Sequence, residues 1–315
     1  MTHPANCTSL GRELVTDTSE VHTPYAFIGV PFGPPYEPAD VHVAASAADA
    51  VRAVTYRYQY ATDRTHYDFD YGAAIFPDDV ATVADCGNVE GDVRNPDAIA
   101  QRATEAIKPL VRAGVVPLVV GGLDSIPPMV VAAFVDVETV NVLHVDAHLD
   151  FREEVGGVRF GYSSPIRRIR ELDCVANITQ VGLRSIGSAR PSDVSDAIGA
   201  GNRLVTAWEL HDTGAHTFVD SLPAEHRFVI TIDCDGLDPS IAPAVGWPEP
   251  GGLTYVQIAT ILRRLAASNR VAAVIFTEFQ PALDHNAITA QTIARLFMNV
   301  MGLQPVPLRS RNAGE

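Results

Sequence analysis

The chain has 315 residues, 47% hydrophobic and 19% charged, which is enough for a substantial core and excludes a disordered protein. Its formal net charge of −15 argues against a nucleic acid or an anionic membrane as partner and would suit a cationic substrate. Scattered cysteines without a CxxC pair, no signal peptide and no apolar run long enough to span a bilayer predict a reduced, cytoplasmic protein.

The expected elements alternate between strands and helices along the chain. A polar N-terminal arm at 1–24 precedes a single domain at 25–304 and a C-terminal tail at 305–315. Apolar runs bounded by turn residues predict strands at 26–30, 80–86, 115–120, 140–143, 178–181, 228–232 and 271–276. Helices are predicted at 44–53, 96–113, 126–134, 166–172, 254–267 and 287–301, with Asn95 capping the second of them.

This alternation, together with strands that are apolar throughout, predicts an α/β protein with a mostly parallel sheet covered on both faces. Neither an internal repeat nor a change of composition divides the chain. Ligands of such sheets bind outside the carboxyl ends of the strands, so a binding site is expected among the residues that follow the strands.

Acidic residues follow two of the predicted strands. The strand at 140–143 leads into His-Val-Asp-Ala-His-Leu-Asp, and a period of two points Asp146, His148 and Asp150 the same way. Asp233 and Asp235 follow the strand at 228–232 with the same spacing. Carboxylates and an imidazole gathered at one sheet edge could bind two metal ions. The competing interpretation, solvated loop acids or helix caps, explains one such pair better than two.

Longer motifs surround these acids. They read Asp146-Ala147-His148-Leu149-Asp150, then Asp233-Cys234-Asp235-Gly236-Leu237-Asp238-Pro239, then Pro248-Glu249-Pro250-Gly251-Gly252-Leu253. In this order they resemble the ureohydrolase family of arginases, agmatinases and guanidinobutyrases, over about residues 28–303. The resemblance implies a three-layer arginase/deacetylase-type fold with a twisted, mostly parallel sheet of about eight strands. It also implies two Mn²⁺ ions, hydrolysis of a guanidino group to urea and an amine, and a homo-oligomer, a trimer or hexamer.

The resemblance also implies a role for each acid. Asp146 and Asp233 would bridge the two ions, His148 and Asp235 would complete one, and Asp150 the other. Asp150 would also hold the attacking hydroxide and help to move a proton to the leaving amine. Glu278 stands where the family carries the glutamate that pairs with the guanidinium. Alternatively, Glu278 is an acid at the end of a strand that forms an ion pair on the surface.

The first metal motif of the family is altered here to Gly121-Gly122-Leu123-Asp124-Ser125, so that Asp124 occupies the place of a metal-binding histidine. Asp124 could cap the next helix, or it could still bind a metal through an oxygen, which would favour Mn²⁺ or Mg²⁺ over softer ions. Without Asp124 the site could hold one ion, as the related zinc deacetylases do.

A second departure is Tyr162-Ser163-Ser164-Pro165, where family members carry a His-Gly-Thr-Pro type of stretch. A phenol is a poorer base than imidazole near neutral pH, but Tyr162 could donate a hydrogen bond, stack on a guanidinium or merely pack. Trp247 should reshape the pocket mouth. His144 lies deeper on the metal strand and is interpreted as a hydrogen-bonded core residue, and His285 is a candidate substitute base.

These features predict an agmatinase-like, metal-dependent hydrolase, in which a metal-bridging hydroxide attacks the guanidinium carbon of a small cationic guanidino substrate. Two alternatives stay open. The chain could hydrolyse another amidine or formimino C–N bond. It could also be a catalytically impaired paralogue that serves as a partner subunit, as the changes at Asp124 and Tyr162 suggest. No motif predicts the substrate tail.

Overall fold

The computed structural model describes residues 2–3, 7–37, 43–55, 58, 67–70, 73–74, 82–92, 95–186 and 188–302. Its main sheet has the strand order β1-β5-β2-β6-β11-β10-β7-β8-β9. In that order the bounds are Thr2–His3, Val83–Val89, Tyr25–Val30, Val116–Gly121, Val271–Thr277, Arg227–Asp233, Val140–Val145, Val175–Leu183 and Arg203–Thr206. Eight strands pair in parallel, and only the short edge strand β1 is antiparallel. The α/β class and the parallel sheet of about eight strands are confirmed.

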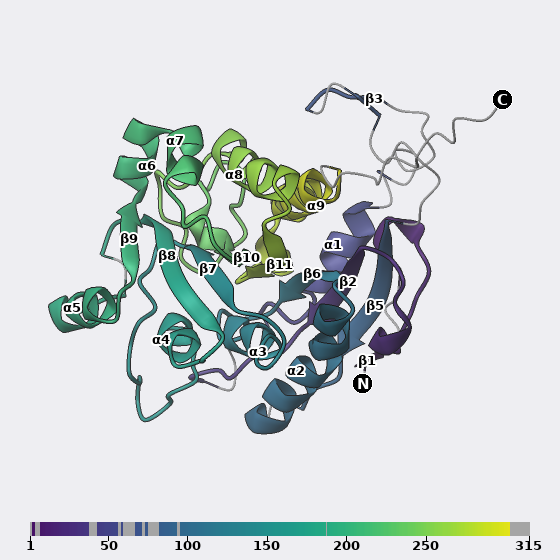
Figure 1. Cartoon of the computed structure of the whole chain (residues 1–315), viewed down its shortest axis with the longest axis horizontal. Coiled ribbons are helices and arrows are strands. Elements are labelled where there is room, and N and C mark those ends of the chain that lie inside the picture. Colours follow the sequence, from purple (N-terminus) through teal and green to yellow (C-terminus); the bar gives the residue numbers. More distant parts are fainter. Residues whose placement is uncertain are drawn as a thin grey trace.

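Helices cover both faces of this sheet, which gives the three layers that were predicted (Figure 1). One layer contains α2 (Pro96–Arg112), α3 (Pro127–Ala132), α4 (Pro165–Arg170) and α5 (Pro191–Gly199). The other contains α1 (Ala47–Thr55), α6 (Ala207–Thr213), α7 (Ala215–Asp220), α8 (Tyr255–Ala267) and α9 (Ile288–Met301). Within the described ranges, none of the helices combines the length and hydropathy needed to cross a bilayer.

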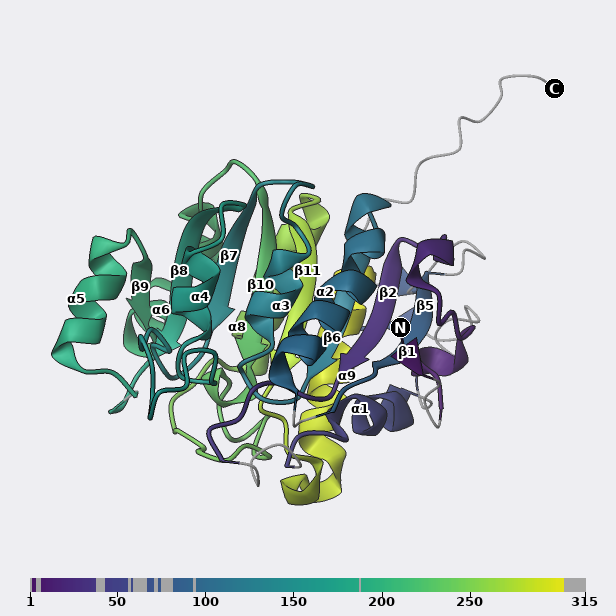
Figure 2. The ribbon, with the colours of Figure 1, turned by 90° about the horizontal axis from the view of Figure 1, so that it is seen from below.

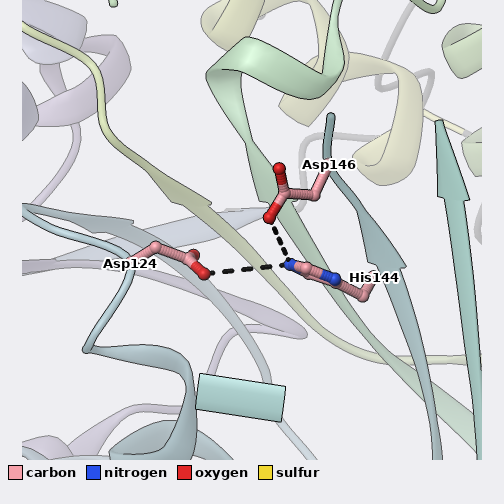
Figure 3. A group of neighbouring side chains, drawn as sticks. All are labelled: Asp124, His144 and Asp146. Carbon is pink, nitrogen blue, oxygen red and sulfur yellow. Dashed lines mark ion pairs between the residues drawn. The ribbon is translucent and has the colours of Figure 1, made fainter. Parts of the chain in front are cut away.

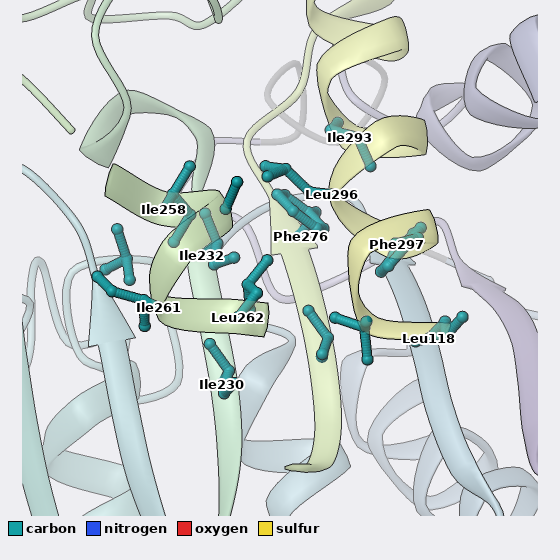
Figure 4. Close-up of a cluster of buried hydrophobic side chains, with 14 of the residues drawn as sticks. Leu118, Ile230, Ile232, Ile258, Ile261, Leu262, Phe276, Ile293, Leu296 and Phe297 are labelled. Atoms are coloured by element: carbon teal, nitrogen blue, oxygen red, sulfur yellow. The ribbon is translucent and has the colours of Figure 1, made fainter. Parts of the chain in front are cut away.

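The core lies between the sheet and each helical layer. Figure 4 shows side chains of α8 and α9, among them Leu262 and Phe297, packed over Ile230 of β10 and Phe276 of β11. Every residue of β6, β7 and β11 is buried, because a central parallel strand is covered on both faces. Uninterrupted burial explains why continuous apolar runs predicted these strands well.

Short elements complete the described chain. A two-stranded hairpin pairs β3 (Tyr67–Asp68) with β4 (Ala73–Ala74). The 3-10 turns are Ser9–Gly11, Thr18–Glu20, Cys234–Gly236, Pro281–Leu283 and His285–Ala287.

The strand predicted at 80–86 is displaced: β5 begins at Val83 and continues to Val89, while residues 80 and 81 lie outside the described part. Gly87 has a φ of +72°, and the register with β2 shifts between Phe27 and Gly29. The strand therefore continues past Gly87 and Asn88 by means of a bulge. In the sequence this Gly-Asn pair resembles a turn, which is why the predicted strand ends before it.

Several residues of the predicted N-terminal arm pack on the sheet. Thr2 and His3 form β1, Leu14 bridges to Asp85, and the amide of Ser9 donates to the Asp85 carboxylate at 2.6 Å. The predicted tail at 305–315 lies outside the described residues.

Four adjacent strands in the middle of the sheet, β6, β11, β10 and β7, run in parallel (Figure 2). Their carboxyl ends therefore lie at the same edge of the sheet. This edge receives the acidic residues that the sequence singled out.

Candidate metal centre

Each of the four central strands delivers acidic residues at its carboxyl end. Asp124 follows β6, Glu278 follows β11, and β10 ends in Asp233, two residues before Asp235. The longest set, Asp146, His148 and Asp150, follows β7. All the aspartates of this set are buried, as are Asp124, Asp233 and Asp235. The structure thus brings the predicted residues of separate strands to one place.

A first group of metal-ligating atoms comes from Asp146, His148 and Asp235, and all of them lie within 4.8 Å of one another. His148 Nδ1 is 3.0 Å from Asp235 Oδ2 and 3.5 Å from Asp146 Oδ1. Two ligand atoms at right angles around one Mn²⁺ ion lie about 3 Å apart, so this spacing fits a shared cation. The amide of Asp235 donates to Asp233 Oδ1 at 2.9 Å and fixes the second carboxylate pair.

A second group contains Asp124, His144 and Asp146 (Figure 3). His144 Nε2 lies 3.0 Å from Asp146 Oδ2 and 3.8 Å from Asp124 Oδ2. Asp124 does not cap the next helix, because the N-cap of α3 is Ile126 and no side chain caps it. Instead, Asp124 Oδ1 accepts a hydrogen bond of 2.5 Å from the Thr277 hydroxyl, which leaves Oδ2 facing the site.

The strand ends can meet because glycine allows a close backbone approach. A Cβ atom on Gly236 would lie 2.6 Å from the backbone nitrogen of Asp146. The turn Cys234–Gly236 therefore rests directly against the end of β7. This contact places Asp235 beside Asp146 and His148, and a larger residue at position 236 would push the two motifs apart.

Four of the acids line a cavity with a volume of about 390 Å³. Asp150, Asp233, Glu278 and Tyr162 are among its lining residues, whereas the predicted ligands Asp124 and Asp146 and the candidate base His285 are not. The remaining lining residues are Val43, Leu123, His148, Ser163, Ser188, Asp235, Gly246, Trp247 and Gln280.

Aromatic residues shape the cavity wall. The Tyr162 ring packs 4.3 Å from that of Tyr36, whose hydroxyl accepts a hydrogen bond of 3.0 Å from the Ser163 amide. Trp247 lies at the cavity with 79% of its surface exposed. The predicted influence of Trp247 on the pocket therefore has a structural basis, and Tyr162 both packs and lines the cavity.

The electrostatics of the site reflect buried like charges. Burial, strengthened by the charge of Asp146, raises the pKa of Asp235 to about 7. Burial and neighbouring acids raise the pKa of Glu278 to about 8 and place those of Asp150 and Asp233 well above the usual range. Burial opposes a charge on His148, but hydrogen bonds with Asp146 and Asp235 outweigh it and raise its pKa to about 11.

A divalent cation would relieve this repulsion, because it stabilises the charged carboxylates. Asp124 Oδ2 and Asp146 Oδ2 are buried, and neither accepts a well-aligned hydrogen bond, although His144 Nε2 lies 3.8 Å from the first and 3.0 Å from the second. A buried carboxylate oxygen that lacks a full hydrogen bond is costly, and here two of them face the same space. A donor set dominated by carboxylates suits a hard divalent ion.

Three residues at the site were not predicted. His144 contacts the centre instead of only the core, Thr277 donates to Asp124, and Arg184 holds the Asp235 turn through that residue's backbone oxygen at 2.6 Å. The sequence does contain a signal for His144, because it lies two residues before Asp146 and so points to the same face of the strand. The contacts of Thr277 and Arg184 are tertiary, and the local spacing of residues does not predict them.

Comparisons with known proteins show the family and the fold to which this chain is similar. Residues 23–302 match the sequence model of the Arginase family. The mitochondrial agmatinase of Gallus gallus is 31% identical over 246 residues, 76% of this chain and 71% of that protein. The guanidinobutyrase of Pseudomonas aeruginosa is 30% identical over 254 residues, 77% of each chain. The solved structure of proclavaminate amidino hydrolase from Streptomyces clavuligerus has the same fold, with a TM-score of 0.79, 22% identity and coverage of 96% and 97% of the two chains.

Proposed function

The chain belongs to the arginase family, and we propose that it is a metal-dependent amidino hydrolase that cleaves a guanidino C–N bond to release urea and an amine. The observation that carries this proposal is the convergence of Asp146, His148 and Asp235 from neighbouring strands beside a cavity lined by further acids. Relatives named as agmatinase and guanidinobutyrase support the guanidino group as the reacting part of the substrate.

We expect two Mn²⁺ ions at this edge of the sheet. His148 and Asp235 would hold one, Asp124 and Asp150 the other, with Asp146 and Asp233 between them. The buried oxygens of Asp124 and Asp146 that accept no well-aligned hydrogen bond support the involvement of Asp124. A bound pair of divalent cations lowers the pKa of water and so supplies a nucleophile near neutral pH.

The residues of the chain orient the substrate and move the proton. Glu278 lines the cavity beside the metal-ligating acids, where its carboxylate can pair with the planar guanidinium. Asp150 would pass a proton to the leaving amine, a role that its burial at the same cavity supports. Tyr162 offers a hydroxyl as donor or a ring face against the guanidinium, and its packing on Tyr36 limits its rotation.

We propose a small cationic guanidino compound as substrate. Among the described residues that line the cavity there is no lysine or arginine, whereas four carboxylates are present. An anionic tail would find no cationic partner among them, while a cationic or neutral tail could lie against Trp247 and Tyr162.

The setting of the enzyme is also a proposal. The four cysteines, Cys7, Cys86, Cys174 and Cys234, form no disulfide, which fits a reducing cytoplasm. We expect a homo-oligomer, a trimer or hexamer, on the family resemblance alone.

The test is urea release by the Mn²⁺-loaded protein from guanidines of similar length whose tails are cationic, neutral or anionic. We expect release that favours the cationic and neutral tails and disappears in Asp233→Asn. Release of formamide and an amine from a formimino compound, without urea from any guanidine, would favour the alternative C–N hydrolase. Absence of all turnover, with stable assembly onto an active relative, would favour the partner-subunit interpretation.

A further inference from the structure

His144 lies on β7 two residues before Asp146, and its ring is fully buried. Nε2 faces the carboxylates of Asp146, at 3.0 Å, and Asp124, at 3.8 Å (Figure 3). The spacing of these three donors would also fit a cation bound directly by the imidazole. His144 Nε2 could therefore donate a hydrogen bond to these carboxylates or bind a cation that they share. The two arrangements differ in which ring nitrogen carries the proton, because only a nitrogen without a proton can bind a metal.

A residue of the neighbouring strand β8 indicates which nitrogen carries the proton. Gln180 of β8 donates its side-chain nitrogen to the backbone oxygen of Leu149 at 2.7 Å, and its side-chain oxygen accepts from Asn202 at 3.1 Å. The contact with Leu149 identifies this atom as the amide nitrogen, since an oxygen there would repel the Leu149 carbonyl. This nitrogen also lies 3.2 Å from His144 Nδ1. Nδ1 therefore accepts a hydrogen, and in a neutral imidazole the proton is then on Nε2.

We propose that His144 is a positioning residue and not a metal ligand. The buried chain from Asn202 through Gln180 fixes the Nε2–H tautomer of His144 and directs that N–H at Asp146 and Asp124. A ligating Nε2 would require a proton on Nδ1, opposite the amide hydrogens of Gln180. No well-aligned hydrogen bond links Nε2 to either carboxylate alone, as expected for one N–H between two acceptors.

Each oxygen of the Asp146 carboxylate faces a different donor. Oδ1 accepts a hydrogen bond of 2.6 Å from the His148 amide, and Oδ2 faces the N–H of His144. Both sides of the carboxylate are thereby oriented, in the residue proposed to bridge two ions. The N–H dipole also offsets part of the charge that Asp124 brings where the family resemblance implies histidine. This inference rests on the proposed metal centre.

The direct test is ¹⁵N NMR of histidine side chains in the full-length protein loaded with Mg²⁺, which is diamagnetic. The signals of His144 are assigned by their loss in His144→Gln. We expect the Nε2–H tautomer, with the ¹⁵N shift of Nδ1 that marks a hydrogen-bond acceptor. A proton on Nδ1, with Nε2 bound to metal, would overturn the proposal. This measurement uses the unaltered chain, so it decides the question even if variants fold poorly.

Variants supply a second readout, the Mn²⁺ dissociation constant. His144→Leu removes the N–H and should weaken Mn²⁺ binding by about 10- to 100-fold, the usual effect of losing an outer partner of a ligand. His144→Gln keeps a donor and should recover most of that loss, whereas a purely packing role would give both variants the same affinity. His211→Leu, on the exposed surface of α6, is the matched control.

Urea release, measured on the same samples, separates this inference from the proposed function. If no guanidine is cleaved but the tautomer and the Mn²⁺ affinities follow the expected pattern, the positioning role stands and the proposed substrate class fails. If urea is released but His144→Leu binds Mn²⁺ as the unaltered protein does, only the positioning role fails.

Discussion

Asp150 and Glu278 share an uncommon backbone conformation, with φ values of +46° and +60°. Residues other than glycine rarely adopt positive φ, and such strain persists only where the surrounding structure enforces it, often at functional sites. The Glu278 amide donates to the Gly122 carbonyl at 2.8 Å, which holds the turn after β11 against the end of β6. The backbone geometry therefore supports active roles for both acids without reference to their charge.

Glu278→Gln tests the role of the carboxylate in binding the guanidinium. The amide can still accept the hydrogen bond of 2.7 Å from the Asp124 backbone, so the turn should persist. A hydrogen bond to a charged group contributes about 1.5–3 kcal/mol, and we therefore expect kcat/KM to fall by about 10- to 150-fold. Mn²⁺ content should not change. Glu249→Gln is the control, because Glu249 does not line the cavity; equal losses in both variants would contradict the assignment.

Strand periodicity and parallel topology predict the acids after β7 and β10, because they determine where such side chains meet. Asp124 and Glu278 are predicted through the family resemblance instead. Asp146, His148 and Asp235 needed only a spacing of two after apolar runs. The contacts of His144 and Thr277 could not be predicted in the same way. The depth of His144 on the strand predicts a hydrogen-bonded core residue, which the buried ring and its contact with Gln180 confirm. That the other ring nitrogen faces the acids is not predicted.

Arg184, just after β8, joins segments that are distant in sequence. Its guanidinium donates to the backbone oxygens of Asp235 and Glu249, both at 2.6 Å, and of Pro250 at 3.1 Å. The turn after β10 and the Pro-Glu-Pro segment are thus held by one side chain. The five donors of a planar guanidinium suit this task, which a lysine could not perform.

Arg184→Ala should therefore loosen the turn that carries Asp235. We expect Mn²⁺ affinity to fall by about 10- to 100-fold, as is usual when a partner that orients a ligand is lost. Arg203→Ala is the control, since Arg203 donates to the Ser221 backbone on an exposed surface. Isothermal titration with Mn²⁺ measures both; unchanged affinity in Arg184→Ala would show that the turn is held by other contacts.

Elements of the central sheet were predictable and those of one edge were not. No element is predicted from the sequence for α5 (Pro191–Gly199), β9 (Arg203–Thr206), α6 (Ala207–Thr213) and α7 (Ala215–Asp220). These are short elements with exposed faces, and two helices meet at Gly214, whose φ is +78°. β9 and α6 pack against β8, and α7 packs against α8. Such elements depend on tertiary contacts, so local periodicity carries little of the signal.

At the scale of the whole molecule, the buried acids connect metal binding to stability. In the metal-free fold, the pKa values of Asp235, Glu278 and His148 are raised to about 7, 8 and 11. Each group then binds a proton in the folded chain that it releases on unfolding, for the acids from about pH 4 to 8 and for His148 from about pH 6.5 upward. Because the folded state binds more protons, its stability falls as pH rises through these windows.

Chelator-treated protein should therefore unfold more easily at pH 8.5 than at pH 6, as measured by urea denaturation. Mn²⁺ keeps the carboxylates charged and His148 neutral in the folded state, so the loaded protein should lose this decline with pH and be the more stable form. Parallel pH dependence of the loaded and the chelator-treated protein would contradict a metal centre among these residues.

The central claim is that side chains from four strand ends gather around a pair of divalent cations. The most direct measurement is an anomalous difference map from crystals of the Mn²⁺-loaded protein. The account predicts two peaks about 3.5–4 Å apart, one within reach of His148 and Asp235, the other beside Asp124 and Asp150. A single peak, or peaks away from the ends of β6, β7 and β10, would contradict it.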